Sequence, residues 1–336
     1  MKNILFCGTP HFATASLEAI YKYQKELNYK LVGLVTIQDR ISGRGQKKQE
    51  SDVKKLGKKL NLKIFTPTEL SDTIFIEKIT KLNLDLIIVV AFKKLPEILF
   101  KIPKHGTINL HASLLPKYRG AAPINWAIIN GEKETGLTTF YINDKIDTGD
   151  IIHQSKVKIK PNCHLDELYN ILMQESDQII FQTIKSIFNN TCNRQQQQQD
   201  TSERQHKYAR KIKKSDLQLD AKFWESKTIK EMYDFIRGMS PPGVKTTIKI
   251  NQNQTMKIII TKVNNFQEKV NDLSKNTAKD IQIKFLDKEN LIVTNGSQIF
   301  NIEKIKTENG KEITAQEFYN GFISNKKVES TFDIIY

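Results

Sequence analysis

The run DLIIVVA at residues 85–91 constrains the fold of this chain more than any other feature. After its aspartate it has no polar residue, so apolar and polar side chains do not alternate along it. A strand of this kind is buried on both faces, as in parallel sheets that carry helices on each side. Strand-like runs and helical patterns alternate through this half of the chain, the strands at residues 3–7, 31–35, 63–65 and 106–110 and the helices at 10–26, 52–60 and 74–82. Repeated β-α units predict an α/β domain with a mostly parallel, Rossmann-like sheet.

The 336 residues exceed a typical single domain, and the composition changes along the chain. Strands at 137–141 and 151–159 and a long helix at 165–188 complete the first domain, predicted as residues 1–188. Residues 189–205 are polar and include five successive glutamines, so we interpret them as an interdomain linker. Residues 206–336 begin with helical patterns and continue with short strands, which predicts a small OB-like β-barrel. Within it, the polar residues 264–280 are predicted to form a surface loop.

The composition argues against several classes of protein. Cys7, Cys163 and Cys192 show neither a CxxC motif nor paired spacing, which disfavours a disulfide framework or a metal site and favours a reducing, cytoplasmic compartment. No apolar run approaches the roughly 18 residues of a membrane span, and the first one is too short for a signal peptide. The formal net charge of +15 favours a polyanionic partner, although a general bias towards Lys, Asn and Ile explains it equally well.

Asn109 lies on the strand predicted at 106–110, and His111 follows two residues later, directly after its end. Side chains alternate along a strand, so both project from the same face at the edge where open α/β sheets bind ligands. An amide that donates to an oxyanion and an imidazole that moves a proton near neutral pH are suited to acyl transfer. An isolated pair of this kind more often marks a capped strand end, with a histidine whose hydrogen bonds are made within the protein. Whether this pair is catalytic is therefore judged from the residues around it.

Those residues resemble the formyltransferase family that uses 10-formyltetrahydrofolate. Its Asn-x-His motif is followed here by SLLP at residues 113–116, RGAAP at 119–123 and DTGD at 147–150. The resemblance implies that an amine attacks the formyl carbon directly, that Asn109 and His111 stabilise the tetrahedral oxygen, and that Asp147 keeps His111 charged and oriented. It implies 10-formyltetrahydrofolate as co-substrate and no metal.

The resemblance also implies where the folate lies. The expected contacts come from the SLLP motif and from the loop AFKKLP at residues 91–96, which is one residue shorter than the family's usual pattern. The implied folate-binding residues are Ser113, Leu114, Leu115, Pro116 and Phe92.

Two basic clusters indicate the acceptor. Residues 36–60 contain eight basic and three acidic residues around an SGRG loop, and residues 206–214 contain five basic residues and no acidic one. The family resemblance implies that both contact initiator methionyl-tRNA, whose amino group would receive the formyl group. The expected RNA-binding residues are Arg44, Lys47, Lys48, Arg210, Lys211, Lys213 and Lys214. A monomer is expected.

Other interpretations remain open. An N-formyltransferase for an amino-sugar nucleotide or another small amine would pair the same catalytic set with an OB-like domain, but it would not need the basic loop around Arg44. A non-catalytic RNA-binding module would have no use for a complete set of Asn109, His111 and Asp147. A hydrolase of the formyl cofactor would normally carry a different companion domain, and a glycinamide ribonucleotide formyltransferase would end near residue 200.

Overall fold

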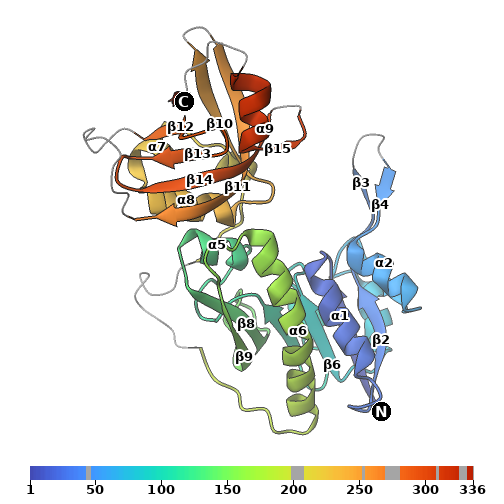
Figure 1. Ribbon diagram of the computed structural model, residues 1–336. Helices are drawn as coiled ribbons and strands as arrows, with labels where there is room; N and C mark the ends of the chain where they lie inside the picture. The colour runs from blue at the N-terminus through green and yellow to red at the C-terminus, as the bar shows by residue number, and fades with distance from the viewer. Residues whose placement is uncertain are drawn as a thin grey trace. The chain divides into compact units, whose positions relative to one another are not determined.

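Seven strands form the first sheet of the computed structural model, in the order β5-β2-β1-β6-β7-β8-β9 (Figure 1). The pairings from β5 to β7 are parallel, whereas β8 pairs antiparallel with both β7 and β9. Their bounds are β1 Lys2–Gly8, β2 Tyr29–Val35, β5 Ile64–Phe65, β6 Leu86–Val90, β7 Thr107–His111, β8 Glu134–Tyr141 and β9 Ile151–Lys158. The predicted mostly parallel α/β sheet is confirmed. The structure describes residues 1–42, 47–197, 208–251, 254–268, 281–307, 310–324 and 331–335.

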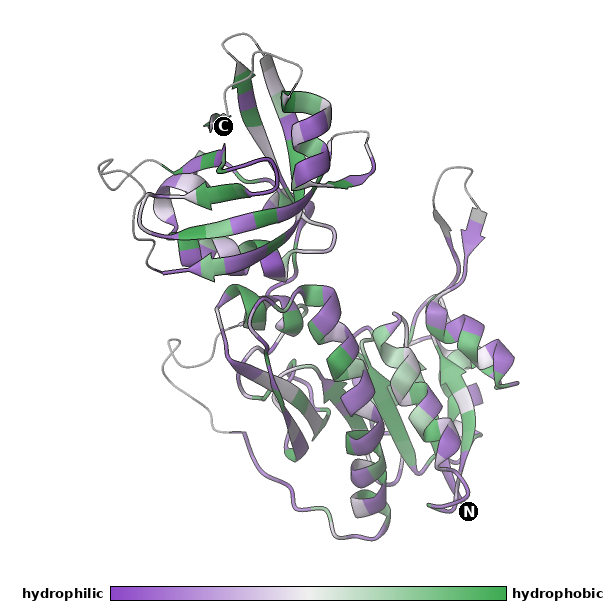
Figure 2. Ribbon diagram, viewed as in Figure 1, coloured by the Kyte–Doolittle hydropathy of each residue, from purple (hydrophilic) through white to green (hydrophobic). Residues whose placement is uncertain are grey.

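The central strand β6 is buried along its whole length, as its apolar run predicts. No residue of β6 is more than 4% exposed, and Figure 2 shows the strands in the middle of this sheet as its most hydrophobic part. Burying one such side chain stabilises the fold by about 1.5–3 kcal/mol. The sheet therefore provides a rigid base for the residues at the ends of its strands.

Helices cover both faces of this sheet. α1 (Phe12–Lys22) and α6 (Leu165–Phe188) lie over one face (Figure 1). On the other face, Phe75 and Ile79 of α3 (Thr73–Thr80) and Leu99 of α4 (Glu97–Phe100) share a core cluster with strand side chains such as Leu5 and Ile87. α2 (Asp52–Lys59) is capped by Ser51, whose hydroxyl accepts from the Lys54 N–H at 3.1 Å. Two short antiparallel strands, β3 (Arg40–Ser42) and β4 (Lys47–Gln49), precede it.

Seven antiparallel strands form the second sheet, in the order β11-β10-β16-β12-β13-β14-β15. A further pairing of β11 with β14 brings the sheet round into a nearly closed barrel, which confirms the predicted OB-like architecture. The bounds are β10 Val244–Asn251, β11 Gln254–Gln267, β12 Gln282–Phe285, β13 Leu291–Thr294, β14 Ile299–Thr307, β15 Glu312–Thr314 and β16 Thr331–Ile335. Its interior is a cluster of buried apolar residues that includes Trp224, Ile258 and Phe300.

The chain divides into two compact units: residues 1–123, 134–158 and 169–209, and residues 124–133, 159–168 and 210–336. The second unit thus includes α5 (Pro123–Ile129), except for its first residue, and the segment that leads into α6. Its remaining helical elements are η1 Lys214–Leu217, α7 Ala221–Ser226, α8 Ile229–Gly238, α9 Ala315–Phe318 and η2 Tyr319–Ile323.

A buried ion pair lies within α8, and its arginine also holds the 159–168 segment of the second unit by a hydrogen bond. The Arg237 guanidinium donates to the Cys163 carbonyl at 2.6 Å and to Asp234 at 2.5 Å, and both charged residues are at most 6% exposed. Lys230 also donates to Asp234. Removing one partner of such a pair would leave an uncompensated buried charge, which typically costs about 3–5 kcal/mol.

The predicted loop at 264–280 was wrong at its start. β11 continues to Gln267 and pairs with β14 as far as Ile299. The start of this polar stretch forms a strand for two reasons. Phe266 stacks on Tyr233, with ring centroids 5.6 Å apart, and the Asn264 amide donates to Glu303 at 2.9 Å. Residues 269–280 lie outside the described part of the chain.

Candidate active site

β7 carries the predicted amide and imidazole on one face at its end. His111 is the last residue of β7 and is 6% exposed. Its Nε2 lies 2.8 Å from the carbonyl oxygen of Tyr118, so this nitrogen carries a proton and donates it. Nδ1 is then the ring nitrogen left for the reacting groups.

Asp147 faces that second nitrogen. Its Oδ2 lies 3.8 Å from His111 Nδ1, too far for a direct hydrogen bond but close enough for a strong electrostatic interaction. The Gly120 N–H donates to the same oxygen at 2.9 Å and fixes its position. Asp147 has a φ of 54°, in the left-handed region that non-glycine residues seldom occupy. The structure therefore brings His111 and Asp147 together through a strained residue held by its surroundings.

The Asn109 side chain is half-buried on the same strand, two residues before His111. Its amide forms no hydrogen bond with any residue in the described part of the chain. An available amide donor beside an imidazole and a carboxylate can stabilise an oxyanion and move a proton. These are the two tasks that acyl transfer to an amine requires.

Two residues that no sequence motif indicated hold the backbone of the SLLP segment by hydrogen bonds. The Thr138 hydroxyl donates to the Ser113 carbonyl at 2.6 Å and accepts from the Leu115 N–H at 3.1 Å. The Gln154 amide donates to the Leu115 carbonyl at 2.9 Å. The sequence shows only that they lie on two predicted strands. In the structure these are β8 and β9, and β8 pairs with β7.

The five residues predicted to bind folate differ in accessibility. Ser113 is fully buried and its hydroxyl donates to the Lys117 carbonyl at 2.7 Å, within its own turn. Leu115 is 3% exposed, whereas Leu114 and Pro116 are half-buried. Phe92 is also partly buried and packs against the core cluster under α3 and α4. Leu114, Pro116 and Phe92 are therefore the members with surface left for a ligand.

A segment predicted as linker returns to this site. The Ile151 N–H donates to the Gln195 carbonyl at 2.8 Å, and the Gln195 N–H donates back at 2.9 Å. The amide of Gln197, 5% exposed, contacts the loop of Asp147. Its oxygen accepts from the Arg119 guanidinium, whose pKa is lowered by burial while nearby Asp147 acts in the opposite direction. Residues 198–205 of the predicted linker lie outside the described residues, so its full extent stays a prediction.

Of the first predicted RNA-binding cluster, Arg44 lies outside the described residues and Lys47 is described only as backbone in β4. Lys48 is exposed on the same strand. α2, which follows, adds two exposed lysines that are paired with carboxylates, Lys55 with Asp52 and Lys58 with Glu50. Contact of this cluster with RNA stays a prediction.

In the second predicted cluster, Arg210 is paired with a carboxylate and three lysines pair with no described residue. Arg210 donates to both oxygens of Asp216 at 2.7 and 2.8 Å and lies 5.0 Å from the centre of the Trp126 ring. These hydrogen bonds lower the pKa of Asp216. The exposed ammonium groups that form no ion pair with a described residue belong to Lys211, Lys213 and Lys214. Arg210 is held by Asp216, whereas the three lysines pair with no described carboxylate, and contact of all four with RNA stays a prediction.

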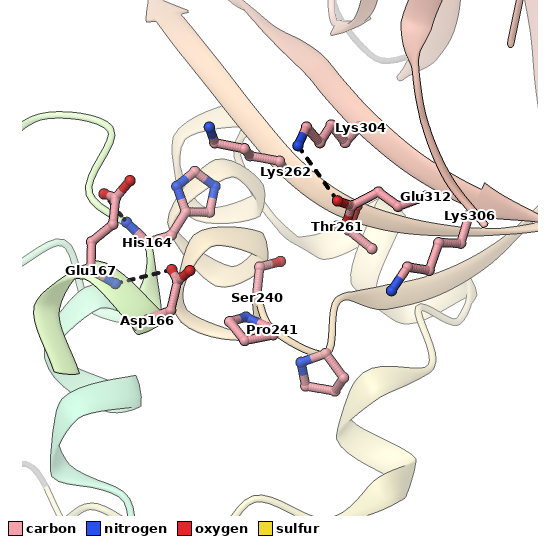
Figure 3. Close-up of a pocket in the computed structure, with 11 residues that line it drawn as sticks. His164, Asp166, Glu167, Ser240, Pro241, Thr261, Lys262, Lys304, Lys306 and Glu312 are labelled. Atoms are coloured by element: carbon pink, nitrogen blue, oxygen red, sulfur yellow. Dashed lines mark hydrogen bonds and ion pairs between the residues drawn. The ribbon is translucent and has the colours of Figure 1, made fainter. Parts of the chain in front are cut away.

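The second unit contains a hollow of about 460 Å³ between the start of α6 and strands β11 and β14 (Figure 3). Its charges are mostly paired within the protein: Lys304 lies 3.5 Å from Glu312, and Lys262 lies 3.1 Å from Glu303. Asp166 accepts from the N–H of Glu167 at 3.0 Å. The hollow contains none of the predicted catalytic residues.

The described residues contain no group of three or more His, Cys, Asp or Glu side chains placed to hold a metal ion. They also contain no helix long and apolar enough to cross a membrane.

Family models match most of this chain. A model described as "Formyl transferase" matches residues 1–184, and one described as "Formyl transferase, C-terminal domain" matches residues 211–323. The methionyl-tRNA formyltransferase of Clostridioides difficile is 36% identical over 322 residues, which are 95% of this chain and 96% of that protein. The methionyl-tRNA formyltransferase of Flavobacterium johnsoniae is 42% identical over 258 residues, 77% of this chain and 78% of that protein.

Solved structures share the fold at lower identity. The N-formyltransferase of Helicobacter canadensis, in complex with folinic acid and dTDP-3-aminofucose, has a TM-score of 0.62 and 21% identity over 90% of this chain and 99% of that one. The sugar 3N-formyltransferase WlaRD has a TM-score of 0.59 and 21% identity over 93% of this chain and 99% of that one. At this identity the likeness shows the fold alone.

Proposed function

The chain belongs to the formyl transferase family, and from this premise we propose that it transfers the formyl group of 10-formyltetrahydrofolate to the amino group of initiator methionyl-tRNA. The match to a methionyl-tRNA formyltransferase along 95% of this chain favours the tRNA acceptor, because it covers the second unit as well as the catalytic one. The observation that carries the chemistry is the arrangement at the end of β7, where His111 lies 3.8 Å from Asp147 and Asn109 presents an amide that bonds no described residue.

The reaction forms a bond between the amino nitrogen and the formyl carbon and breaks the bond from that carbon to N10 of the folate. The amine loses a proton and N10 gains one, so the protein needs to stabilise an oxyanion and move a proton. In our proposal, Asn109 donates to the developing oxyanion and His111 assists from Nδ1. Asp147 stabilises the charged imidazole, and the Tyr118 carbonyl holds the other ring nitrogen.

The folate fits the residues near this strand end. Leu114, Pro116 and Phe92 have surface available for an apolar ring system, and Ser113 and Leu115 hold their segment in shape. We assign the pterin to this segment and to the loop at 91–96. Removing exposed apolar surface on Leu114 would then raise the KM for the folate more than the KM for tRNA.

The tRNA would contact the two lysine-rich clusters. Lys48 with the neighbouring loop, and Lys211, Lys213 and Lys214 in the second unit, have side-chain charges suited to phosphates. We place Arg44 with the first cluster. We further propose that the enzyme acts as a monomer in the cytoplasm, where its substrates are made, because one chain supplies the whole catalytic set.

The decisive test is a parallel acceptor assay with 10-formyltetrahydrofolate as donor. Charged initiator methionyl-tRNA, free methionine, glycinamide ribonucleotide and an amino-sugar nucleotide would each be offered to the wild-type protein and to His111→Ala. We expect transfer to methionyl-tRNA alone, lost in the variant. Transfer only to a small amine would keep the catalytic assignment and replace the acceptor. The absence of transfer to every acceptor would overturn the proposal.

A further inference from the structure

After α6 and the turn at 189–191, residues 192–197 turn back along the first unit; we call them the return segment. Besides the backbone pairing of Gln195 with Ile151, the Arg194 guanidinium lies 3.9 Å from the centre of the Tyr141 ring. A cation over an aromatic face is attracted by the electrons of the ring. These contacts place the end of the segment behind the loop that carries Asp147.

Gln197 uses both ends of its amide in that place. Its Nε2 donates to the carbonyl of Asp147 at 3.1 Å and to the carbonyl of Gly149 at 2.8 Å. Its Oε1 accepts from Arg119 Nε at 3.1 Å and from a terminal guanidinium nitrogen at 2.6 Å. Because acceptors surround the nitrogen and donors surround the oxygen, the partners define the orientation of the amide. The side chain is 5% exposed, so water does not substitute for these contacts.

The loop that Gln197 holds has little freedom of its own. Asp147 occupies the left-handed region, which persists only where surrounding contacts enforce it. Gly149 lies so close to the Tyr141 carbonyl that an added Cβ would be 1.7 Å from its oxygen. Gln197 thus fixes the carbonyls on both sides of Thr148, while the Gly120 N–H fixes the carboxylate of Asp147.

We propose that Gln197 is a positioning residue for formyl transfer, which holds the Asp147 carboxylate against His111 and keeps Arg119 beside it. The inference rests on the proposed function. Gln197 touches no reacting group, so it acts through Asp147. A misplacement of about 1 Å at a catalytic group can lower turnover by about a hundredfold.

Three variants test this assignment. Gln197→Ala removes all four hydrogen bonds. Gln197→Glu keeps the shape and the contact with Arg119 but turns a carboxylate towards two carbonyl oxygens. Gln196→Ala is the matched control, because the neighbouring side chain is exposed.

For Gln197→Ala we expect kcat for formyl transfer to fall roughly tenfold or more, with the KM of each substrate within about twofold. For Gln197→Glu we expect a similar loss from pH 6 to pH 8, because a carboxylate beside the Arg119 guanidinium stays ionised and donates to neither carbonyl. The control should match the wild type at every pH. A merely structural glutamine would lower thermal stability and leave kcat and the pH profile unchanged. A folded Gln197→Glu protein with kcat within twofold of wild type across this pH range would overturn the proposal.

Amide hydrogen exchange separates this proposal from the proposed function, since it needs no substrate. In Gln197→Ala, the amides of Gly120 and Ile151, which anchor the loop and the return segment, should exchange at least tenfold faster than in Gln196→Ala. Faster exchange in a protein that formylates no acceptor would support the positioning role and refute the function. Unchanged exchange at Gly120 would refute the positioning role, whatever the activity.

Discussion

Asp147→Asn separates the charge of this residue from its shape. Asparagine tolerates the left-handed backbone that Asp147 adopts, and its amide oxygen can still accept from the Gly120 N–H. The change therefore removes little besides the negative charge that faces His111. Its effect on turnover measures how much the carboxylate stabilises the charged imidazole.

The magnitude follows from the distance and the burial. At the observed 3.8 Å, two unit charges interact by about 4 kcal/mol at an effective dielectric constant of about 20. Both side chains are mostly buried, 7% and 14% exposed, so solvent screens the pair only in part. If the asparagine dipole retains between a quarter and a half of this interaction, about 2–3 kcal/mol is lost, which is roughly a 30- to 160-fold reduction in rate.

Single-turnover formylation of methionyl-tRNA with saturating folate would measure the chemical step. Asp144→Asn is the control, since it removes an exposed carboxylate from the same loop. We expect a loss near a hundredfold in Asp147→Asn and none in the control. Turnover within threefold of wild type in Asp147→Asn would show that the carboxylate does not act on His111, despite the distance between them.

The remaining predictions address other parts of the molecule. His111→Ala should lower initial rates of formyl transfer roughly a hundredfold or more, and near-normal turnover would remove this ring from the mechanism. Arg44→Ala should raise the KM for tRNA, leave that for folate unchanged, and reduce the salt slope of tRNA binding by about 1; an unchanged slope would exclude this side chain from the RNA contact. Gly149→Ala should cost about 1–3 kcal/mol in urea unfolding and lower kcat, because the new methyl group meets a backbone oxygen at 1.7 Å, whereas a stable, active variant would show that the loop can move freely. Burial lowers the pKa of His164, which accepts from the Val263 N–H and is therefore neutral in the folded state. Neutral His164 stabilises the fold fully above its unfolded-state pKa, near 6.5, and this contribution declines as the pH falls below that value. The unfolding free energy should therefore decrease from pH 7.5 to 5.5, with a smaller decrease in His164→Gln.

The elements that sequence patterns predicted best have either a regular apolar period or a short uninterrupted apolar run. α6 and β13 have the bounds predicted for them, Leu165–Phe188 and Leu291–Thr294. The first helix is shorter than the predicted 10–26 and spans Phe12–Lys22, since residues 23–28 form turns. β16 was missed, because a five-residue strand near the end of the chain gains its stability from pairing with β10 and β12.

The catalytic set shows a similar division. The spacing of Asn109 and His111 predicts a shared face, because the period of a strand is two residues. Asp147 lies 36 residues after His111 and reaches it through the turn after β8, which no local pattern encodes. Only the DTGD motif indicated it. Thr138 and Gln154 could not be inferred, since they act by bracing a backbone segment that is distant in sequence.

Composition predicted a linker over the return segment, whereas in the structure Gln197 bonds the Asp147 loop. A run of five glutamines has no apolar side chain to bury, so it is read as solvated and unstructured. Yet an amide carries two donors and an acceptor, and these are the groups needed where a loop presents unpaired carbonyls next to a guanidinium. Gln196 and Gln197 have the same side chain, but only Gln197 lies at such a place, and only it is buried. The structural role of this glutamine therefore comes from the backbone atoms of the Asp147 loop. A change to that loop, such as Gly149→Ala, should also loosen the return segment and speed amide exchange at Ile151.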